Sequence, residues 1–294
     1  MSSRLARLRR RAGFLERLRN YWAIYSESKV HVVALILFIA EVILATLAPY
    51  LPLPDPHALK YPMFLPPSTK HPFGTDSMGR DIFSRVIWGA RTSLEVGVIA
   101  AGISALVGIL IGAIAGYYGG LMDDVLSRIT DIFLMIPAFF LILYVAAVYG
   151  ASIYCIMAII GLTIWPSNAR IMRAQVLSLK EREFIQAEVL MGASNFRILF
   201  HHIIPNAIQP VLANTILQMA RAIIIEASLS YIGVGDPNVI SWGRMIYEGQ
   251  AFLATYPWVP LFPGLAIAYT VFLVNVIGDG LSKVLAPKIG RRLV

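Results

Sequence analysis

Long, uninterrupted apolar stretches are the feature that most limits what this chain can fold into. A helix needs about 20 apolar residues to cross the hydrocarbon core of a bilayer, and the 294-residue sequence has several stretches of that kind. Only 14% of its residues are charged, compared with roughly 25% in soluble domains, and its mean hydropathy is +0.69. The sequence therefore predicts an all-α, polytopic helical membrane protein.

The breaks between these stretches predict six transmembrane helices. Pro137 should kink the third of them, because proline removes a main-chain donor and clashes with the preceding turn. The fourth should end at Trp165 and Pro166, where the apolar run stops. We expect the six helices at 30–48, 92–116, 125–149, from 151 to this break, 210–232 and 258–277.

The distribution of basic residues orients the predicted helices. With the N-terminus inside, the cytoplasmic segments hold 18 Lys or Arg residues and the external segments hold six. Cytoplasmic loops carry the excess of such residues, so both termini are expected in the cytoplasm of a multi-pass cell-membrane protein. The chain then divides into a cytoplasmic basic N-terminal segment (1–29), the first span (30–48), an external loop with a lead-in helix (49–91), a five-span core (92–284) with a cytoplasmic loop (168–208), and a cytoplasmic tail (285–294).

The N-terminal segment places apolar residues at roughly helical spacing among seven arginines, a pattern typical of a helix that lies on an anionic membrane surface. The alternative is a solvated basic tail. This lead and the apolar run after it are both too long for a cleaved signal peptide, so the first span is expected to be retained. The apolar positions are Leu5, Leu8, Ala12, Leu15, Leu18 and Trp22.

Small residues recur at every fourth position of the second predicted helix. Such a ridge lets another helix approach closely, which favours helix association where lipid is as apolar as the helix. Five positions in register predict a seam with protein rather than a face toward lipid. They are Ala100, Ser104, Gly108, Gly112 and Gly116.

Just before that helix, Asp76 with Arg80 and Asp81 with Arg85 are opposite charges four residues apart, a spacing that brings side chains together on a helix. They favour a structural lead-in helix over a catalytic or cation site. The five histidines lack an HxxxH spacing, so no metal site is expected. The single cysteine, Cys155, excludes an internal disulfide framework.

A charged stretch, EREFIQAEVLMGASNFRILFHHIIPN at 181–206, interrupts the apolar sequence. Gly192 sits where the preceding helical pattern must stop, because glycine tolerates the left-handed backbone that ends a helix. Ser194 can cap the next helix, which leads through Pro205 into the fifth span. Four apolar residues of that short helix fall on one face: Phe196, Leu199, Phe200 and Ile203.

An exposed apolar stripe on such a hairpin needs a partner. The stripe either packs beneath the chain's own membrane domain or fills a groove on another protein. The periodicity alone does not choose between these two interpretations.

The stretch from Ala169 to Asn206 resembles the cytoplasmic EAA loop of binding-protein-dependent ABC import permeases. That loop has the pattern Glu-Ala-Ala, three residues, Gly, nine residues, Ile, any residue, Leu, Pro. Gly192 has the required spacing, whereas the triplet and the first closing position depart from the pattern. The triplet is Gln186, Ala187 and Glu188, and the closing positions are His202, Ile204 and Pro205.

Three further blocks resemble the second permease subunit of dipeptide and oligopeptide importers, and the similarity covers residues 71–288. They are HPFGTDSMGRDIFSRVIWGARTSLEVG, EASLSYIGVGDPNVISWGRMI and PWVPLFPGLAIAYTVFLVNVIGDGLSKVLAPK. This resemblance implies the type I ABC importer permease fold. It also implies four kinds of partner besides the lipid membrane: a homologous second permease, two ATPase subunits, an external solute-binding protein and a transported peptide.

In such a permease the hairpin would dock in a groove of an ATPase subunit. The residues that the resemblance assigns to this coupling are Gln186, Ala187, Glu188, Gly192, Ala193, Ser194, Phe196, Arg197, Phe200, His202 and Pro205. We expect no enzymatic activity and no cofactor in this chain, because it lacks a GxxxxGK[ST] phosphate loop. ATP and Mg are expected in the partner ATPases, and nucleic acid is not expected as a partner.

Two alternatives remain open. The same type of importer carries oligosaccharides or nickel in some organisms, and a stand-alone, ion-coupled secondary transporter would use intramembrane carboxylates. Such a carrier has no need of an ATPase-docking hairpin. Four charged residues lie in or near the spans and are candidates for the pathway or for pairing between subunits: Glu41, Asp131, Arg221 and Glu226.

Overall fold

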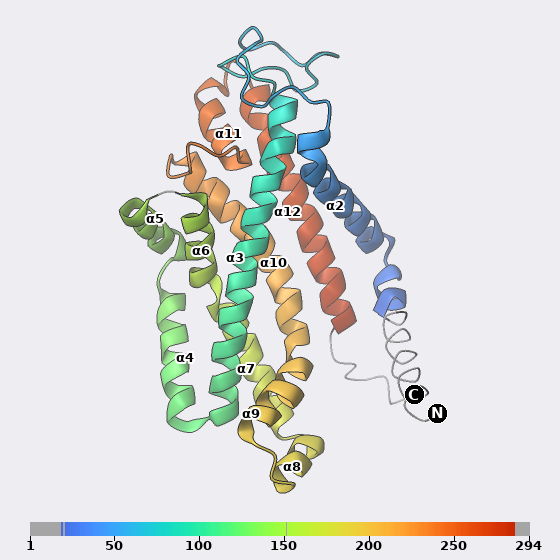
Figure 1. Ribbon diagram of the computed structural model, residues 1–294, viewed down its shortest axis with the longest axis vertical. Helices are drawn as coiled ribbons and strands as arrows, with labels where there is room; N and C mark the ends of the chain where they lie inside the picture. Colours follow the sequence, from blue (N-terminus) through green and yellow to red (C-terminus); the bar gives the residue numbers. More distant parts are fainter. Residues whose placement is uncertain (1–18, 20, 151, 286–294) are drawn as a thin grey trace.

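The computed structural model describes residues 19, 21–150 and 152–285, which form an elongated bundle of helices without a β-strand (Figure 1). The apolar positions expected on a surface helix between Leu5 and Leu18, and all but one residue of the predicted tail, lie outside the described residues. The α-helices are α2 (Lys29–Leu47), α3 (Ile82–Tyr118), α4 (Gly120–Met135), α5 (Ala138–Tyr149), α6 (Ile153–Ile164), α7 (Pro166–Lys180), α8 (Glu183–Leu190), α9 (Asn195–Arg197), α10 (Ile204–Tyr231), α11 (Trp242–Gly249) and α12 (Trp258–Leu285). Three short segments complete the order: the 3-10 helices η1 (Ala48–Tyr50) and η3 (Gln250–Phe252), and the π-helix η2 (Ile198–Ile203).

Four helical segments of the described chain are long and apolar enough to cross a membrane: α2 with η1, α3, α9 through α10, and α12. Two bent pairs, α4 with α5 and α6 with α7, also meet this test, with bends of 85° and 41°. If each bent pair is one span, the six predicted spans are all present.

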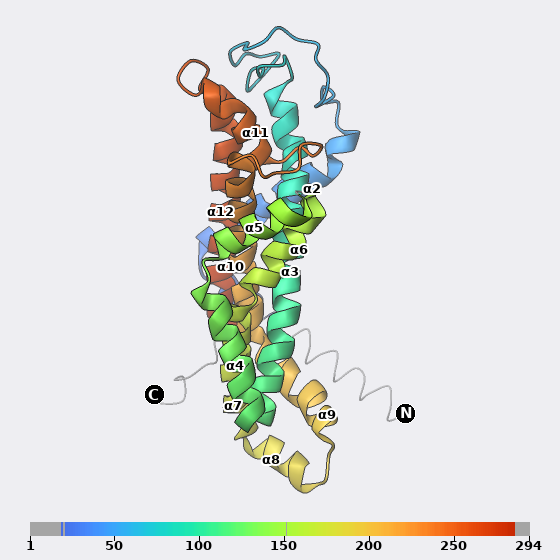
Figure 2. The ribbon, with the colours of Figure 1, turned by 90° about the vertical axis from the view of Figure 1, so that its left-hand side faces the viewer.

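The third span differs most from its prediction. A proline disfavours the helical conformation of the residue before it, and Ile136 is accordingly extended, with ψ at 125°. Pro137 therefore ends α4 rather than kinking it. The next helix, α5, turns away and lies across the bundle in both side views (Figures 1 and 2).

The fourth span ends where the sequence predicts, but the chain stays helical. Pro166 begins α7, since proline is well tolerated in the first turn of a helix. The structure places residues 168–180, expected in the cytoplasmic loop, on this helix. α8 follows only after a break at Glu181 and Arg182.

The small-residue ridge of α3 packs against α7. A Cβ atom added to Gly108 would lie 2.5 Å from Asn168 Cβ, and one added to Gly112 would lie 2.3 Å from the main-chain oxygen of Ala169. The seam with protein is confirmed, but it lies within this chain rather than between subunits.

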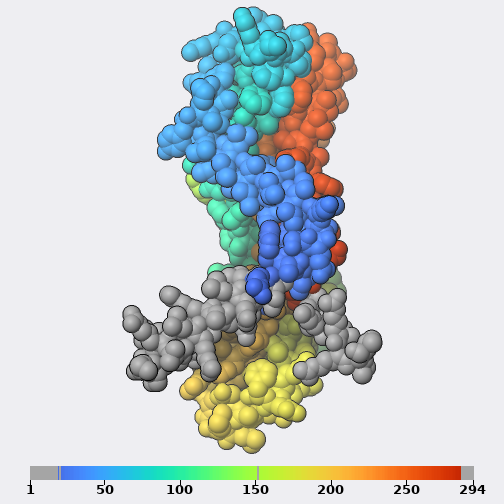
Figure 3. Space-filling view, turned by 90° about the vertical axis from the view of Figure 1, so that its right-hand side faces the viewer, coloured from blue at the N-terminus to red at the C-terminus, as the bar shows by residue number. Residues whose placement is uncertain are grey.

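The two ends of the bundle differ in construction. The loop at 51–81 and α11 cover one end, and α8 and α9 form the other (Figure 2). A space-filling view of the α2 side shows the same order, with α2 in blue below the loop and the hairpin in yellow at the opposite end (Figure 3). Buried apolar clusters hold the two ends: one around Trp242 and Ile223, the other around Met172 and Ile203.

Candidate functional site

The hairpin at the α8 end is formed by α8, a glycine turn, α9 and η2. Gly192 has φ at +77°, in the left-handed region expected for the residue that ends a helix. The main-chain N–H of Ala193 donates to Glu188 O at 3.1 Å and that of Gly192 donates to Val189 O at 3.0 Å, so the last carbonyls of α8 are satisfied. This turn confirms the prediction at Gly192.

The second arm of the hairpin begins as predicted. Ser194 Oγ accepts the main-chain N–H of Arg197 at 3.3 Å, which caps α9. Beyond it, the backbone widens into the π-helix η2 before α10 begins at Ile204, and Pro205 lies in the first turn of α10.

The predicted apolar stripe divides into two faces. Leu199 and Ile203 are buried with Met172 and Val176 of α7. Phe196 and Phe200 instead stack on each other, with ring centroids 4.5 Å apart, and are 65% and 39% exposed. Of the two interpretations of the stripe, packing beneath the chain's own domain therefore holds for Leu199 and Ile203, whereas Phe196 and Phe200 do not pack there.

Exposed apolar side chains also occur on α8 and at the turn. Leu190 is 88% exposed, although a leucine of a packed domain is normally covered. We define the hairpin's apolar surface as Phe184, Val189, Leu190, Met191, Phe196 and Phe200. An exposed apolar group of this size, in so small a segment, is typical of an interaction surface.

Two departures from the EAA pattern lie next to each other. Glu188 Oε1 is 3.7 Å from His202 Nε2, which brings together side chains of α8 and η2. Gln186 is exposed and its amide donates to Glu181 O at 3.4 Å, while Ala187 and Arg197 are exposed. The polar departures are thus placed along the hairpin rather than in its core.

Polar contacts attach this end of the bundle to the C-terminal end of α3. Lys180 Nζ donates to the main-chain oxygen of Tyr117 at 2.7 Å, and the Tyr117 hydroxyl donates to Asn195 Oδ1 at 2.9 Å. Because α3 is the longest helix of the described chain, these contacts link the end of α7 and the second arm of the hairpin to the element that runs the length of the bundle.

The four charged candidates of the spans do not form one group. Glu41 accepts a hydrogen bond from Thr270 of α12, and Asp131 pairs with Arg170 at 2.6 Å with both side chains about half exposed. Arg221 is exposed on α10.

Glu226 is buried within the subunit, where its Oε1 accepts from Ser230 at 2.7 Å and from Ser241 at 2.8 Å. Ser241 also caps α11 through the main-chain N–H of Arg244, so Glu226 supports the start of that helix. The geometry favours a structural role for this carboxylate.

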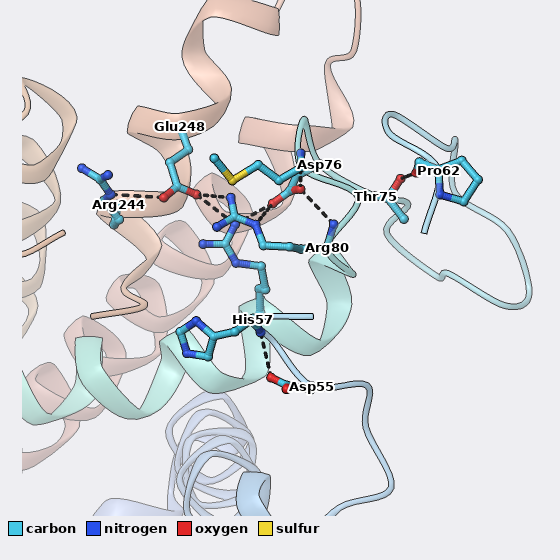
Figure 4. A network of polar contacts seen from close by, with 10 residues as sticks. Asp55, His57, Pro62, Thr75, Asp76, Arg80, Arg244 and Glu248 are labelled. Carbon is cyan, nitrogen blue, oxygen red and sulfur yellow. Dashed lines mark hydrogen bonds and ion pairs between the residues drawn. The ribbon is translucent and has the colours of Figure 1, made fainter. Parts of the chain in front are cut away.

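A network of ion pairs lies at the opposite end of the bundle (Figure 4). Asp76 Oδ2 is 2.6 Å from Arg80 Nε and 2.6 Å from Arg85 Nη1. Glu248 Oε2 is 2.7 Å from Arg80 Nη2 and 2.9 Å from Arg85 Nη1, while Arg244 lies 3.2 Å from Glu248 Oε1. The network joins the loop and α3 to α11.

The predicted pair of Asp76 with Arg80 is confirmed, but that of Asp81 with Arg85 is wrong. Asp81 caps α3 by accepting the N–H of Ser84 at 2.8 Å, and its other oxygen lies 2.7 Å from His71 Nδ1. The expected lead-in helix is present only in part: α3 begins at Ile82, so residues 82–91 are helical and continue directly into the second span, whereas Asp76 and Arg80 lie in the turn before it.

Burial opposes ionisation of Glu248, but Arg85, Arg80 and Arg244 beside it outweigh this effect and hold the pKa of Glu248 below its ordinary value. Its carboxylate therefore stays charged within the network over the physiological range.

Residues 108–291, more than half of the chain, match the family described as "Binding-protein-dependent transport system inner membrane component". The chain belongs to this family. It has the type I ABC importer permease fold, and family membership decides against the ion-coupled secondary transporter.

Two relatives show how far the likeness extends. The permease is 42% identical over 225 residues to the oligopeptide transport system permease protein OppC of Bacillus subtilis (strain 168), covering 76% of this chain and 74% of that protein. It is 38% identical over 265 residues to the dipeptide transport system permease protein DppC of Alkalihalophilus pseudofirmus, covering 89% and 87%.

The fold is shared with a solved transporter. The MetNI methionine ABC transporter, in an inward-facing conformation, has a chain that matches this permease with a TM-score of 0.54 at 18% identity. The match covers 69% of this chain and 97% of that one.

Two residues of the ion-pair network, Arg244 and Glu248, were not predicted from the sequence. They stand four residues apart on one helix, a spacing that could have marked them. The contacts of Glu248 to Arg80 and Arg85 bridge more than 160 positions in the chain. No local pattern reveals a pairing of that kind.

Proposed function

We propose that this permease forms half of the translocation pathway of a binding-protein-dependent ABC importer for peptides, and that the hairpin's apolar surface docks on an ATPase subunit. The observation that carries the proposal is the division of the hairpin. Leu199 and Ile203 already satisfy the need to pack on the permease's own domain. Phe196, Phe200 and Leu190 are left to a partner.

The remaining partners follow from the family. A second, homologous permease, two ATPases and an external solute-binding protein would complete the importer, and ATP and Mg would be bound by the ATPases. The relatives described above carry dipeptide or oligopeptide in their names. This favours peptides over oligosaccharides and nickel as the cargo.

The orientation of the permease follows from the charge distribution. Eighteen basic residues in one set of segments against six in the other support an orientation with the hairpin and both termini in the cytoplasm. The ion-pair network and the loop at 51–81 would then face the external binding protein.

The proposal is tested by placing a charge on each face of the hairpin. Phe196→Asp puts a carboxylate into the docking surface, where a partner would have to desolvate it. We expect the ATPase subunits to bind at least tenfold more weakly, a loss of about 1.4 kcal/mol or more. The measurement is the amount of ATPase that co-purifies with the tagged permease, together with the melting temperature of the permease.

Leu199→Asp is the matched control, because Leu199 is 2% exposed and three positions away. It should lower the melting temperature of the permease itself. Full retention of ATPase by the Phe196→Asp complex would contradict the assignment of this surface.

A further inference from the structure

A cluster of buried polar side chains lies at the point where α3, α7 and α10 meet. We call it the amide cluster and define it as Ser104 of α3, Ser167 and Asn168 of α7, and Asn214, Thr215 and Gln218 of α10. Ser104, Asn168 and Gln218 are buried. All six residues lie on helices that are long and apolar enough to span a membrane or that form part of a bent span.

The hydrogen bonds of the cluster are extensive. Gln218 Nε2 donates to Ser167 Oγ at 2.8 Å and to the main-chain oxygen of Ile164 at 3.2 Å. Its Oε1 accepts from the Ser104 hydroxyl. Both ends of this amide are therefore engaged, one with α6 and α7 and the other with α3.

Asn168 is engaged in the same way. Its Oδ1 accepts from Asn214 Nδ2 at 2.8 Å, and its Nδ2 donates to Ser104 Oγ at 3.2 Å. Asn214 Nδ2 also donates to Ser167 Oγ at 2.8 Å. Each helix of the three is thus bonded to both of the others through side chains.

The cluster lies at the junction between α6 and α7. Ile164 is the last residue of α6, where main-chain carbonyls lack a partner within their own helix. Ser167 and Asn168 lie in the first turn of α7. Gln218 therefore bonds to both sides of the 41° bend between α6 and α7.

The glycine ridge fixes the same helix further along. A Cβ atom on Gly112 would lie 2.3 Å from Ala169 O, and one on Gly116 would lie 2.9 Å from Arg173 O. The backbones of α3 and α7 therefore approach each other closely over about one turn next to the cluster. α7 is held to α3 by close packing and to α10 by amide hydrogen bonds.

α7 is also the helix that leads to the hairpin. Its 15 residues extend about 22 Å from the bend toward α8. If Trp165 and Pro166 alone connected α6 to α7, the angle between these helices could change when α8 is displaced. Polar groups are expensive inside a membrane, and apolar side chains would pack these helices without directional bonds.

We infer that the amide cluster fixes the angle of α7 to α3 and α10. Movement of the docked hairpin is thereby transmitted through α7 to these two long spans. This inference rests on the proposed function. Gln218 and Asn168 are positioning residues that act through α7 and touch neither nucleotide nor cargo.

The test uses the complete importer in proteoliposomes, with its binding protein in the ligand-loaded form in which it is purified. Gln218→Leu removes the bonds to both sides of the bend, and Ser167→Ala removes the hydroxyl that accepts from Gln218 and Asn214. ATP hydrolysis is measured with and without the binding protein. We expect both variants to retain the ATPase subunits and the basal rate of hydrolysis. The stimulation of hydrolysis by the binding protein should be at least fivefold lower than in the wild type.

The concentration of binding protein at half-maximal stimulation should stay unchanged, because docking at the outer surface is not altered. Thr163→Val is the matched control, since this buried hydroxyl bonds only to Ile159 O of its own helix. It should leave the stimulation ratio as in the wild type.

Variants with a lowered melting temperature but full stimulation would overturn the inference and leave the cluster a purely structural feature. If Gln218→Leu does not assemble, Ser167→Ala decides the question, because it removes one small group. A wild-type complex without stimulation by any binding protein would instead contradict the proposed function.

Discussion

Two carboxylates, Asp76 and Glu248, hold three arginines at the end of the bundle opposite the hairpin. Arg85 is 3% exposed and contacts both of them. Removing one partner of a buried ion pair leaves the other charge uncompensated. This destabilises the protein far more than replacing the whole pair by apolar residues. These few side chains therefore tie the loop at 51–81 and the start of α3 to α11.

This arrangement predicts a pH dependence. Because the folded-state pKa of Glu248 is depressed, its contribution to stability is fully present above the unfolded-state pKa of about 4.3 and is lost as the pH falls through the folded-state value. Glu248→Gln should remove about 1.5–3 kcal/mol at neutral pH. The difference in melting temperature between wild type and variant, measured from pH 7 to pH 3, should shrink as the pH falls.

A constant difference across that range would contradict the role of the charge. Thr255→Ala, in the nearby outer loop, serves as a control with no titrating group.

At the scale of elements, the contact of α3 with α7 organises the half of the subunit that carries the hairpin. The ridge glycines bring the two helices to backbone contact, and the cluster around Met172, Val176 and Ile203 then closes the hairpin onto them. A defect in this contact should appear as unfolding of the permease rather than as loss of its partners.

Gly112→Ala tests this point. The added Cβ would lie 2.3 Å from a main-chain oxygen, so the helices must separate, and overpacking of this kind costs about 1–3 kcal/mol. Gly102→Ala on the same helix has no atom within 4 Å of the new Cβ, and it should be neutral or stabilising because alanine is the better helix former. Melting of the purified permease measures both, and equal melting temperatures would contradict the close approach.

The sequence predicts the elements that depend on local physics. Long apolar stretches locate the spans, Gly192 and Ser194 mark the hairpin's turn and cap, and the small-residue ridge predicts a protein seam. The sequence does not predict features that depend on contacts between segments far apart in the chain. The π-helix at Ile198–Ile203 divides the apolar stripe, and Arg85 bonds to Glu248, 163 positions away, instead of to Asp81.

The angle between the two helices that flank a proline is equally hard to predict from the sequence. Both Pro137 and Pro166 interrupt apolar runs, yet one produces a turn of 85° and the other a bend of 41°. The second is restrained by Gln218 and the amide cluster, whereas α4 has only Thr130 buried and little to hold α5 in line with it.

At the scale of the whole molecule, the proposed orientation separates the two ends by the membrane. In a chain with Cys155 replaced by serine, Leu59→Cys places a thiol on the outer loop and Leu121→Cys places one at the turn between α3 and α4; both positions are exposed. A membrane-impermeant maleimide should label only Leu59→Cys in intact cells. Labelling of only Leu121→Cys would invert the topology.

The break at Pro137 also bears on how such a subunit is made. α4 with 16 residues and α5 with 12 extend about 24 Å and about 18 Å, so neither alone crosses a hydrocarbon core of about 30 Å. Main-chain groups at a break in that core must be covered by protein or water, because lipid offers no hydrogen bonds. A copy inserted without its partners would present this break to lipid, so we expect it to be less stable in the membrane than a copy in the assembled importer.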